Sequence, residues 1–186
     1  MKKLKVYVAG KVSKESSFGT HYWRDEFVKK LEELSGIKLI NLDPTKKSVN
    51  QNFHEDAFGA DIYMISQSDA VIVYLSDDIS VGGSQEILVG QYFNKPVIGL
   101  APLGGKFNML DKEIFGQKVK HYKHPFVYGT CDVVCNDIEG VAKTLKNLDK
   151  IKPKTIDLIR EAADKFEKEG LESDTYLSGL FGKKQK

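Results

Sequence analysis

The chain contains only two cysteines among its 186 residues, Cys131 and Cys135. Two cysteines do not make the disulfide framework of a small secreted protein. Their spacing, with no third or fourth ligand nearby, does not fit a zinc site either. We therefore expect two reduced cysteines, in or beside a strand, in a cytoplasmic protein without a bound metal.

Long apolar runs and a large net charge are also absent. No run approaches the roughly 20 apolar residues of a membrane-spanning helix, and no signal-peptide core follows residues 1–3. The net charge is +2, which is too small to indicate binding to nucleic acid. The excess lysines lie near the two ends, as solvated termini do. We expect neither a membrane nor a nucleic acid as a partner.

What the sequence does have is a strongly patterned segment between residues 70 and 100. Residues 70–75 form a continuous apolar run rich in β-branched side chains, which is typical of a strand buried on both faces of a parallel sheet. A loop with two glycines follows at 80–86, then a helix, then a second strand at 97–100. The loop therefore lies at the carboxyl end of a strand, where open parallel sheets bind ligands. Glu86 is expected in the first turn of the helix.

Strands and helices alternate along the chain to about residue 148. Further strands are expected at 4–9, 37–42 and 132–135, and further helices at 21–34, 53–66, 107–115 and 137–148. This alternation predicts an α/β fold, a five-stranded parallel sheet with helices on both faces. Right-handed crossovers favour the flavodoxin-like (Rossmann-like) order 2-1-3-4-5, which places the end of the first strand beside the glycine loop. We expect one α/β domain at 1–150, and a C-terminal helix and tail at 151–186.

Asp61 has an unusual position in the helix expected at 53–66. The apolar stripe of that helix consists of Ala57, Phe58, Ile62 and Ile65. Asp61 lies within the stripe, where a carboxylate is costly unless it is paired, hydrogen-bonded or functional. It is either a functional acid or a carboxylate that caps a loop or lies at the rim of the core.

Glu86 is the second candidate acid. An acid in a first helical turn is stabilised by the helix dipole, and this alone explains many such glutamates. Here Gly82 and Gly83 allow a ligand to approach the backbone closely, while serine hydroxyls and a helix N-terminus favour phosphate. The loop lacks the dinucleotide fingerprint and the P-loop lysine. Two carboxyls with Tyr7 suggest cleavage of a glycosidic bond, in which one carboxylate attacks the anomeric carbon and another acid assists the leaving group.

Five stretches carry a resemblance to a known family. They are residues 6–10, Asp61, residues 68–73, residues 80–90 and residues 94–97. In this order and spacing the sequence resembles the nucleoside 2-deoxyribosyltransferase family, which includes a branch of 2'-deoxynucleoside 5'-monophosphate N-glycosidases. The similarity covers about residues 4–105, with a looser match to about 148.

The resemblance implies a role for each matching residue. Glu86 matches the nucleophile that forms a glycosyl-enzyme intermediate, Asp61 the acid that handles the proton on the departing base, and Tyr7 the tyrosine that orients the nucleophile or the sugar. The residues expected to bind the substrate, several of them around its 5' end, are Gly10, Lys11, Ser80, Gly82, Gly83 and Asn108. In transferases of the family, an asparagine in a stretch resembling that of Asn108 comes from a neighbouring subunit. No cofactor is implied.

Ser80 bears on the choice between the two branches. At this position, transferases that hold a free 5'-hydroxyl tend to carry aspartate, and monophosphate hydrolases tend to carry serine. The family also implies a homo-oligomer, and the aromatic residues Trp23, Tyr92 and Phe93 are expected to be incompletely covered within one chain. Two alternatives stay open: a ribonucleoside monophosphate N-glycosidase, and a nucleotide-binding module without turnover.

Overall fold

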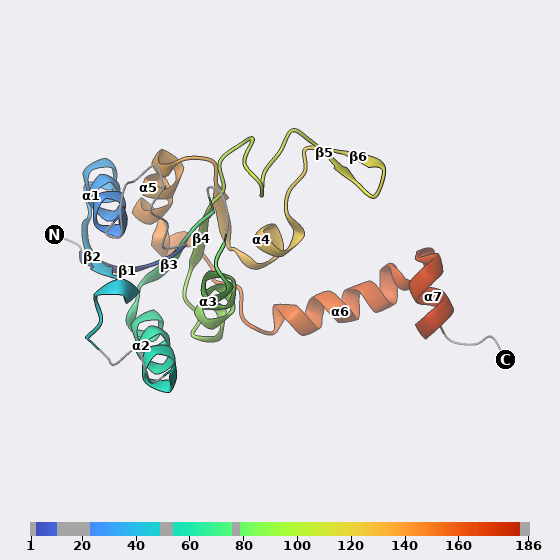
Figure 1. Cartoon of the computed structure of the whole chain (residues 1–186), viewed down its shortest axis with the longest axis horizontal. Helices are drawn as coiled ribbons and strands as arrows, with labels where there is room; N and C mark the ends of the chain where they lie inside the picture. Colours follow the sequence, from blue (N-terminus) through green and yellow to red (C-terminus); the bar gives the residue numbers. More distant parts are fainter. Residues whose placement is uncertain (1–2, 11–22, 49–53, 76–78, 183–186) are drawn as a thin grey trace. The chain divides into compact units, whose positions relative to one another are not determined.

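The computed structural model describes residues 3–10, 23–48, 54–75 and 79–182 (Figure 1). The chain divides into two compact units, Met1–Lys154 and Thr155–Lys186, which are described separately. None of the helices in these described ranges combines the length and the apolar character needed to cross a bilayer.

The first unit is built on a five-stranded parallel sheet. In spatial order its strands are β2 (Lys38–Leu42), β1 (Lys3–Ala9), β3 (Ala70–Tyr74), β4 (Val97–Leu100) and β7 (Val133–Cys135). Because β7 is the fifth strand of this sheet along the chain, the predicted order 2-1-3-4-5 is confirmed. The central strand β3 is buried at all five positions, as its continuous apolar sequence predicts.

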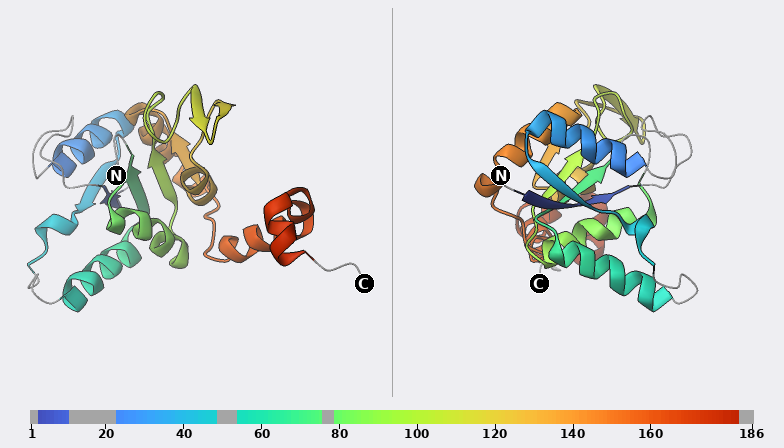
Figure 2. Two further views of the ribbon diagram at one scale, coloured as in Figure 1. Left: turned by 45° about the vertical axis from the view of Figure 1, so that its right-hand side comes forward. Right: turned by 90° about the vertical axis from the view of Figure 1, so that its left-hand side faces the viewer.

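Helices cover both faces of this sheet, as the alternating pattern predicts (Figures 1 and 2). On one face lie α1 (Trp23–Ser35) and α5 (Ile138–Lys146); on the other lie α2 (His54–Gln67), α3 (Val81–Tyr92) and the short α4 (Pro125–Thr130). Successive side chains of a strand point to opposite faces. Val6 and Val8 of β1 therefore pack in the core with α1 and α5, whereas Tyr7 packs in the core with α2 and α3.

The α1 side of the core includes a cluster of aromatic rings. Trp23 packs against Phe27 and Tyr74, with ring centroids 6.1 and 4.9 Å away. Its exposed fraction is 1%, so the expectation that Trp23 is incompletely covered is wrong. Tyr92 is 66% exposed and Phe93 is partly buried. A homo-oligomer stays a prediction.

Helix α3 lies very close to the sheet because it carries a glycine at the point of contact. A methyl group added at Gly90 would lie 3.0 Å from Cγ2 of Val97 and 3.2 Å from Cγ2 of Val71. These side chains belong to β4 and β3. A larger residue at position 90 would therefore require these side chains or α3 to shift.

A β-hairpin replaces the short helix expected at 107–115, and that prediction is wrong. Strands β5 (Asp111–Ile114) and β6 (Gln117–Lys120) pair antiparallel, outside the main sheet. The two residues between them, Phe115 and Gly116, have φ values of 50° and 77°. Positive φ at both positions is what a tight two-residue hairpin turn requires.

The described part of the first unit also contains two 3-10 turns, two free cysteines and a hydrogen-bonded lysine at its end. The 3-10 turns are Pro44–Lys46 and Leu148–Lys150. Both Cys131 and Cys135 are free and buried, beside and within β7, as predicted. The unit ends at Lys154, whose backbone N–H donates to Oδ1 of Asp132 and whose ammonium donates to the carbonyl oxygens of Gly129 and Cys131.

The second unit consists of α6 (Leu158–Glu169), a 3-10 turn (Leu171–Ser173) and α7 (Thr175–Phe181). Helix α6 matches the C-terminal helix expected within 151–186, and α7 lies in the part expected to be a tail. Apolar side chains from both helices line one hollow, namely Ala163, Phe166, Leu171, Leu177 and Phe181.

Candidate active site

The centre of the candidate site is a hydrogen bond between β1 and α3. Tyr7 is fully buried near the carboxyl end of β1, and its hydroxyl donates to Oε1 of Glu86 over 2.8 Å. The strand order explains this contact, because β1 and β3 are neighbours and α3 follows β3. The topology thus joins residues that are far apart in sequence.

Glu86 does not lie in the first turn of its helix, which corrects the expectation stated above. Helix α3 begins at Val81, so Glu86 is in the second turn. Its carboxyl is largely buried, and this burial raises its pKa. The hydrogen bond from Tyr7 opposes that rise, the charge of Asp61 adds to it, and the charges of Arg24 and Lys47 lower the pKa. The ionised form of Glu86 is therefore supported by specific neighbours rather than by the helix dipole.

Tyr7 is held in its neutral, donating form. Burial raises the pKa of Tyr7 far above its ordinary value, and the carboxylates of Glu86 and Asp61 raise it further. A neutral phenol 2.8 Å from a carboxylate donates its proton into the hydrogen bond and orients the carboxylate.

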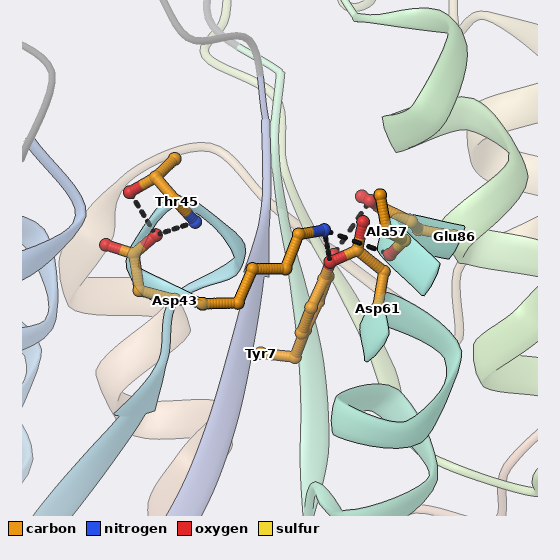
Figure 3. A network of polar contacts seen from close by, with 7 residues as sticks. Tyr7, Asp43, Thr45, Ala57, Asp61 and Glu86 are labelled. Carbon is orange, nitrogen blue, oxygen red and sulfur yellow. Dashed lines mark hydrogen bonds and ion pairs between the residues drawn. The ribbon is translucent and has the colours of Figure 1, made fainter. Parts of the chain in front are cut away.

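Asp61 belongs to the same cluster, in an ion pair that the sequence did not indicate. Figure 3 shows its side chain, from α2, beside Glu86 and Tyr7. The Lys47 ammonium lies 2.6 Å from Oδ1 of Asp61 and donates to the carbonyl oxygen of Ala57 over 3.0 Å. Phe58, placed by sequence in the same apolar stripe, is 63% exposed, so that part of the stripe was wrong. Asp61 lies at the rim of the core and is paired.

The chain reaches this ion pair through a turn that Asp43 builds. Oδ1 of Asp43 accepts hydrogen bonds from the backbone N–H and the hydroxyl of Thr45, which caps the 3-10 turn after β2 (Figure 3). Lys47 follows directly after that turn. Only 11% of the Lys47 side chain is exposed, so its ammonium is held within the site rather than in solvent.

Arg24 is a second functional candidate that sequence reasoning missed. Its guanidinium is 2% exposed and donates from Nε to the carbonyl oxygen of Val8 and from Nη2 to that of Gly10. It thereby fixes the backbone that follows Tyr7 on β1. Its charge also lowers the pKa of Glu86. The only sequence signal is a cation within the first turn of an amphipathic helix, which normally indicates a solvated position.

The glycine loop packs closely around the same point. The hydroxyl of Ser80 accepts from the N–H of Gly83 over 3.0 Å and so caps α3. A methyl group at Gly83 would lie 3.1 Å from that hydroxyl oxygen and 3.8 Å from the backbone nitrogen of Gly10. A methyl group at Gly82 would lie 3.7 Å from Oε1 of Glu86. Gly82 therefore lies next to the Glu86 carboxylate, and Gly83 packs between Ser80 and Gly10.

Of the other two expected substrate-binding residues, Lys11 lies outside the described residues, and Asn108 does not join this group. Asn108 is 6% exposed, and its amide donates to the carbonyl oxygen of Ala101 and to Oδ1 of Asn136. Within the described part of this chain, its amide takes no part in the hydrogen bonds of Tyr7 and Asp61. A role for Asn108 in the site of a neighbouring copy stays a prediction.

A separate cavity of about 310 Å³ lies between α3 and α4. Its walls are mostly apolar, and the residues that line it include Ile79, Ile87, Phe107, His124 and Val127. Neither Glu86 nor Asp61 lines this cavity. We therefore place the candidate active site at these two carboxylates and not in the cavity. Among the described residues, no group of three or more His, Cys, Asp or Glu side chains is arranged to hold a metal ion.

Comparison with solved structures gives clear matches. A 2-deoxyribosyltransferase from Bacillus psychrosaccharolyticus aligns with a TM-score of 0.51 and 14% identity, over 81% of this chain and 97% of the other. This chain has the fold of a 2-deoxyribosyltransferase. The enzyme of that name from Leishmania mexicana aligns with the same TM-score and 19% identity, over 77% of this chain and 97% of its own.

A CMP N-glycosidase from Clostridium botulinum also aligns, with a TM-score of 0.43 and 14% identity over 77% of this chain and 98% of its own. Comparisons with protein-family models and with curated proteins give no match. The resemblance stated from the sequence is thus confirmed at the level of the 2-deoxyribosyltransferase fold.

Proposed function

We propose that the protein cleaves the N-glycosidic bond of a 2'-deoxynucleoside or its 5'-monophosphate. The sugar passes through a covalent intermediate on Glu86 and then to a second base or to water. The observation that carries this proposal is the buried Tyr7–Glu86 hydrogen bond, with the carboxylate of Asp61 close enough to shift the pKa of Glu86. A buried carboxyl with a raised pKa, as at Glu86, is typical of active sites.

The first chemical step uses Glu86 as the nucleophile. An oxygen of its carboxylate attacks C1' of the sugar, and the electron pair of the C1'–N bond leaves with the base. Tyr7 holds the carboxylate in one orientation, so that little freedom is lost when the transition state forms. The sugar's ring oxygen stabilises the positive charge that develops at C1', and the step requires no metal or organic cofactor.

The second step decides between transfer and hydrolysis. The ester between Glu86 and C1' is attacked by the nitrogen of an incoming base or by water, which restores the carboxylate. Transfer and hydrolysis are both compatible with the arrangement of Tyr7, Asp61 and Glu86. A nucleotide-binding module without turnover would not need a largely buried acid whose raised pKa is opposed by Tyr7, Arg24 and Lys47.

The neighbourhood of Ser80 supports a pocket that tolerates a 5'-phosphate. Ser80 and the two glycines lie at the N-terminus of α3, where backbone N–H groups and the helix dipole favour an anion. A carboxylate at position 80 would repel a phosphate, whereas a serine hydroxyl does not. The proposed substrates are therefore small nucleosides or nucleotides, with the monophosphate favoured.

The test is to incubate the protein with each 2'-deoxynucleoside and each 5'-monophosphate, with and without a second base, and to measure the released base by chromatography. Matched ribonucleotides test the choice of sugar. Glu86→Gln serves as the control for contaminating enzymes. If the folded protein releases no base from any of these substrates, the proposed function is wrong.

A further inference from the structure

The charge arrangement at Asp61 bears on how the departing base obtains its proton. A nucleobase leaves far more readily when one of its nitrogens is protonated as the C1'–N bond breaks. Asp61 faces an ammonium 2.6 Å away. In this ion pair the lysine nitrogen is the hydrogen-bond donor and the Asp61 oxygen is the acceptor. The pair therefore holds a proton donor, and that donor is Lys47.

The position of Lys47 is suited to this task. Its ammonium has three N–H bonds, and the contacts with Asp61 and the carbonyl oxygen of Ala57 account for two of them. The side chain is 11% exposed, whereas that of Asp61 is 26% exposed. The ammonium also lies near enough to Glu86 for its charge to affect that carboxylate. Lys47 thus borders both the proposed nucleophile and the acid next to it.

We propose that Lys47, in place of the Asp61 that the resemblance implies, is the proton donor to the departing base, and that Asp61 positions its ammonium. The inference rests on the proposed function. As the C1'–N bond breaks, its electron pair moves to the base nitrogen, a Glu86 oxygen bonds to C1', and a proton passes from Nζ of Lys47 to the base. The resulting neutral amine regains its proton in the second step, from the attacking water or from the N–H of the incoming base.

The groups that face Lys47 favour this cycle. Asp61 of α2 and Glu86 of α3 are acidic and stabilise the ammonium before the reaction, and the Tyr7 phenol of β1 is neutral. When Glu86 becomes an ester, it loses its charge. The Asp61 carboxylate then stays as the acid paired with the Lys47 nitrogen.

The test compares leaving bases that differ in their need for a proton. Suitable pairs are a purine 2'-deoxynucleoside with its N7-methyl derivative, whose base already carries a positive charge, or 2'-deoxyuridine with its 5-fluoro derivative, whose base is more acidic. The pair is chosen among the bases that the wild type releases. We expect Lys47→Met to slow release of the ordinary base by about a hundredfold or more. We expect a much smaller loss for the activated base.

A second variant separates charge from proton donation. Lys47→Arg keeps a cation beside Asp61, but a guanidinium does not give up its proton in a protein. We expect Lys47→Arg, like Lys47→Met, to lose activity on the ordinary substrate and to keep activity on the activated one. Lys46→Gln is the matched control, because Lys46 is the adjacent lysine, pairs with Asp25 and is not part of the site. We expect this control to keep wild-type rates on both substrates.

Equal losses on both substrates in a folded Lys47 variant would show a merely structural role and overturn the inference. Wild-type activity of Lys47→Met or Lys47→Arg on the ordinary substrate would also overturn it. Melting temperatures identify variants that fail to fold, and Lys47→Arg decides the question if Lys47→Met does not fold. A wild type that releases no base at all would refute the proposed function instead, so the two failures are distinguishable.

Discussion

The hydroxyl of Tyr7 donates a 2.8 Å hydrogen bond to Oε1 of Glu86, across 79 positions of sequence. Burial raises the pKa of Glu86, and this hydrogen bond opposes the rise. The phenol therefore does two things at once. It orients the carboxylate, and it extends to lower pH the range in which that carboxylate is ionised.

Replacing this donor should change both the rate and its pH dependence. In Tyr7→Phe, Glu86 loses a hydrogen bond to its charged form, and we expect kcat/KM to fall roughly 10- to 100-fold. The acidic limb of the pH–rate profile should move to higher pH, because the pKa of Glu86 rises when the donor is removed. Base release measured between about pH 4 and 8 tests this prediction. An unchanged acidic limb would contradict it.

Glu86→Gln should nearly abolish turnover without unfolding the protein. An amide does not attack C1', so we expect a loss on the order of a thousandfold in kcat. Circular dichroism and a melting curve check the fold. A folded variant that keeps more than about a tenth of the wild-type rate would show that Glu86 is not the nucleophile.

The same substitution should make the protein more stable at neutral pH. Burial raises the pKa of Glu86 in the folded state, so its protonated form favours folding and that contribution is lost as pH rises through the folded pKa. The glutamine variant carries no such charge. We expect its melting temperature to exceed that of the wild type at pH 7, by a margin that narrows as pH falls. A constant margin between pH 7 and pH 4 would contradict this explanation.

Ser80→Asp offers a test of the 5' end of the substrate that leaves the helix cap in place. Aspartate caps helices as well as serine does, so we expect little change in the melting temperature. Repulsion between its carboxylate and a phosphate should shift the preference from the monophosphate toward the free nucleoside. The measurement is the ratio of kcat/KM for the two substrates. If the wild type already prefers the free nucleoside tenfold or more, Ser80 does not belong to a phosphate site.

The two cysteines should be unreactive in the folded protein. Burial raises the pKa of Cys131 to about 12, and burial also raises that of Cys135. Little thiolate is therefore present at pH 8, and the thiols are covered. We expect slow reaction with a chromogenic disulfide reagent in the native protein and two equivalents after denaturation. A native thiol that reacts as fast as free cysteine would contradict this prediction.

The sequence was sufficient to predict the sheet and the approach of Tyr7 to Glu86. Continuous apolar strands and right-handed crossovers leave few strand orders, and one of these orders places the ends of β1 and β3 side by side. The pairing of Lys47 with Asp61 could not be predicted from the sequence. Lys47 lies after a 3-10 turn in a polar stretch with no periodicity, and nothing local shows which way its side chain points.

The errors have physical causes of the same kind. The hairpin of β5 and β6 depends on a Phe115–Gly116 turn, and phenylalanine at positive φ is rarely found in such turns. Arg24 was missed because its partners are the backbone carbonyl oxygens of Val8 and Gly10, and such contacts leave no trace in the sequence. Phe58 fits the helical spacing of the core, but its side chain is exposed to solvent.

Because Gly90 has no side chain, α3 lies close to the sheet, and α3 carries the proposed nucleophile Glu86. Gly90 lies one helical turn after Glu86, where α3 is within van der Waals contact of Val71 and Val97. A methyl group there would lie 3.0 Å from Val97 and 3.2 Å from Val71, so either these side chains or α3 itself must shift by a few tenths of an ångström. To the extent that α3 shifts, the position of the reacting oxygen is controlled from the buried side of α3, by a residue that touches no ligand. Selection for faster or slower chemistry can therefore act at this helix–sheet contact while the pocket keeps its residues.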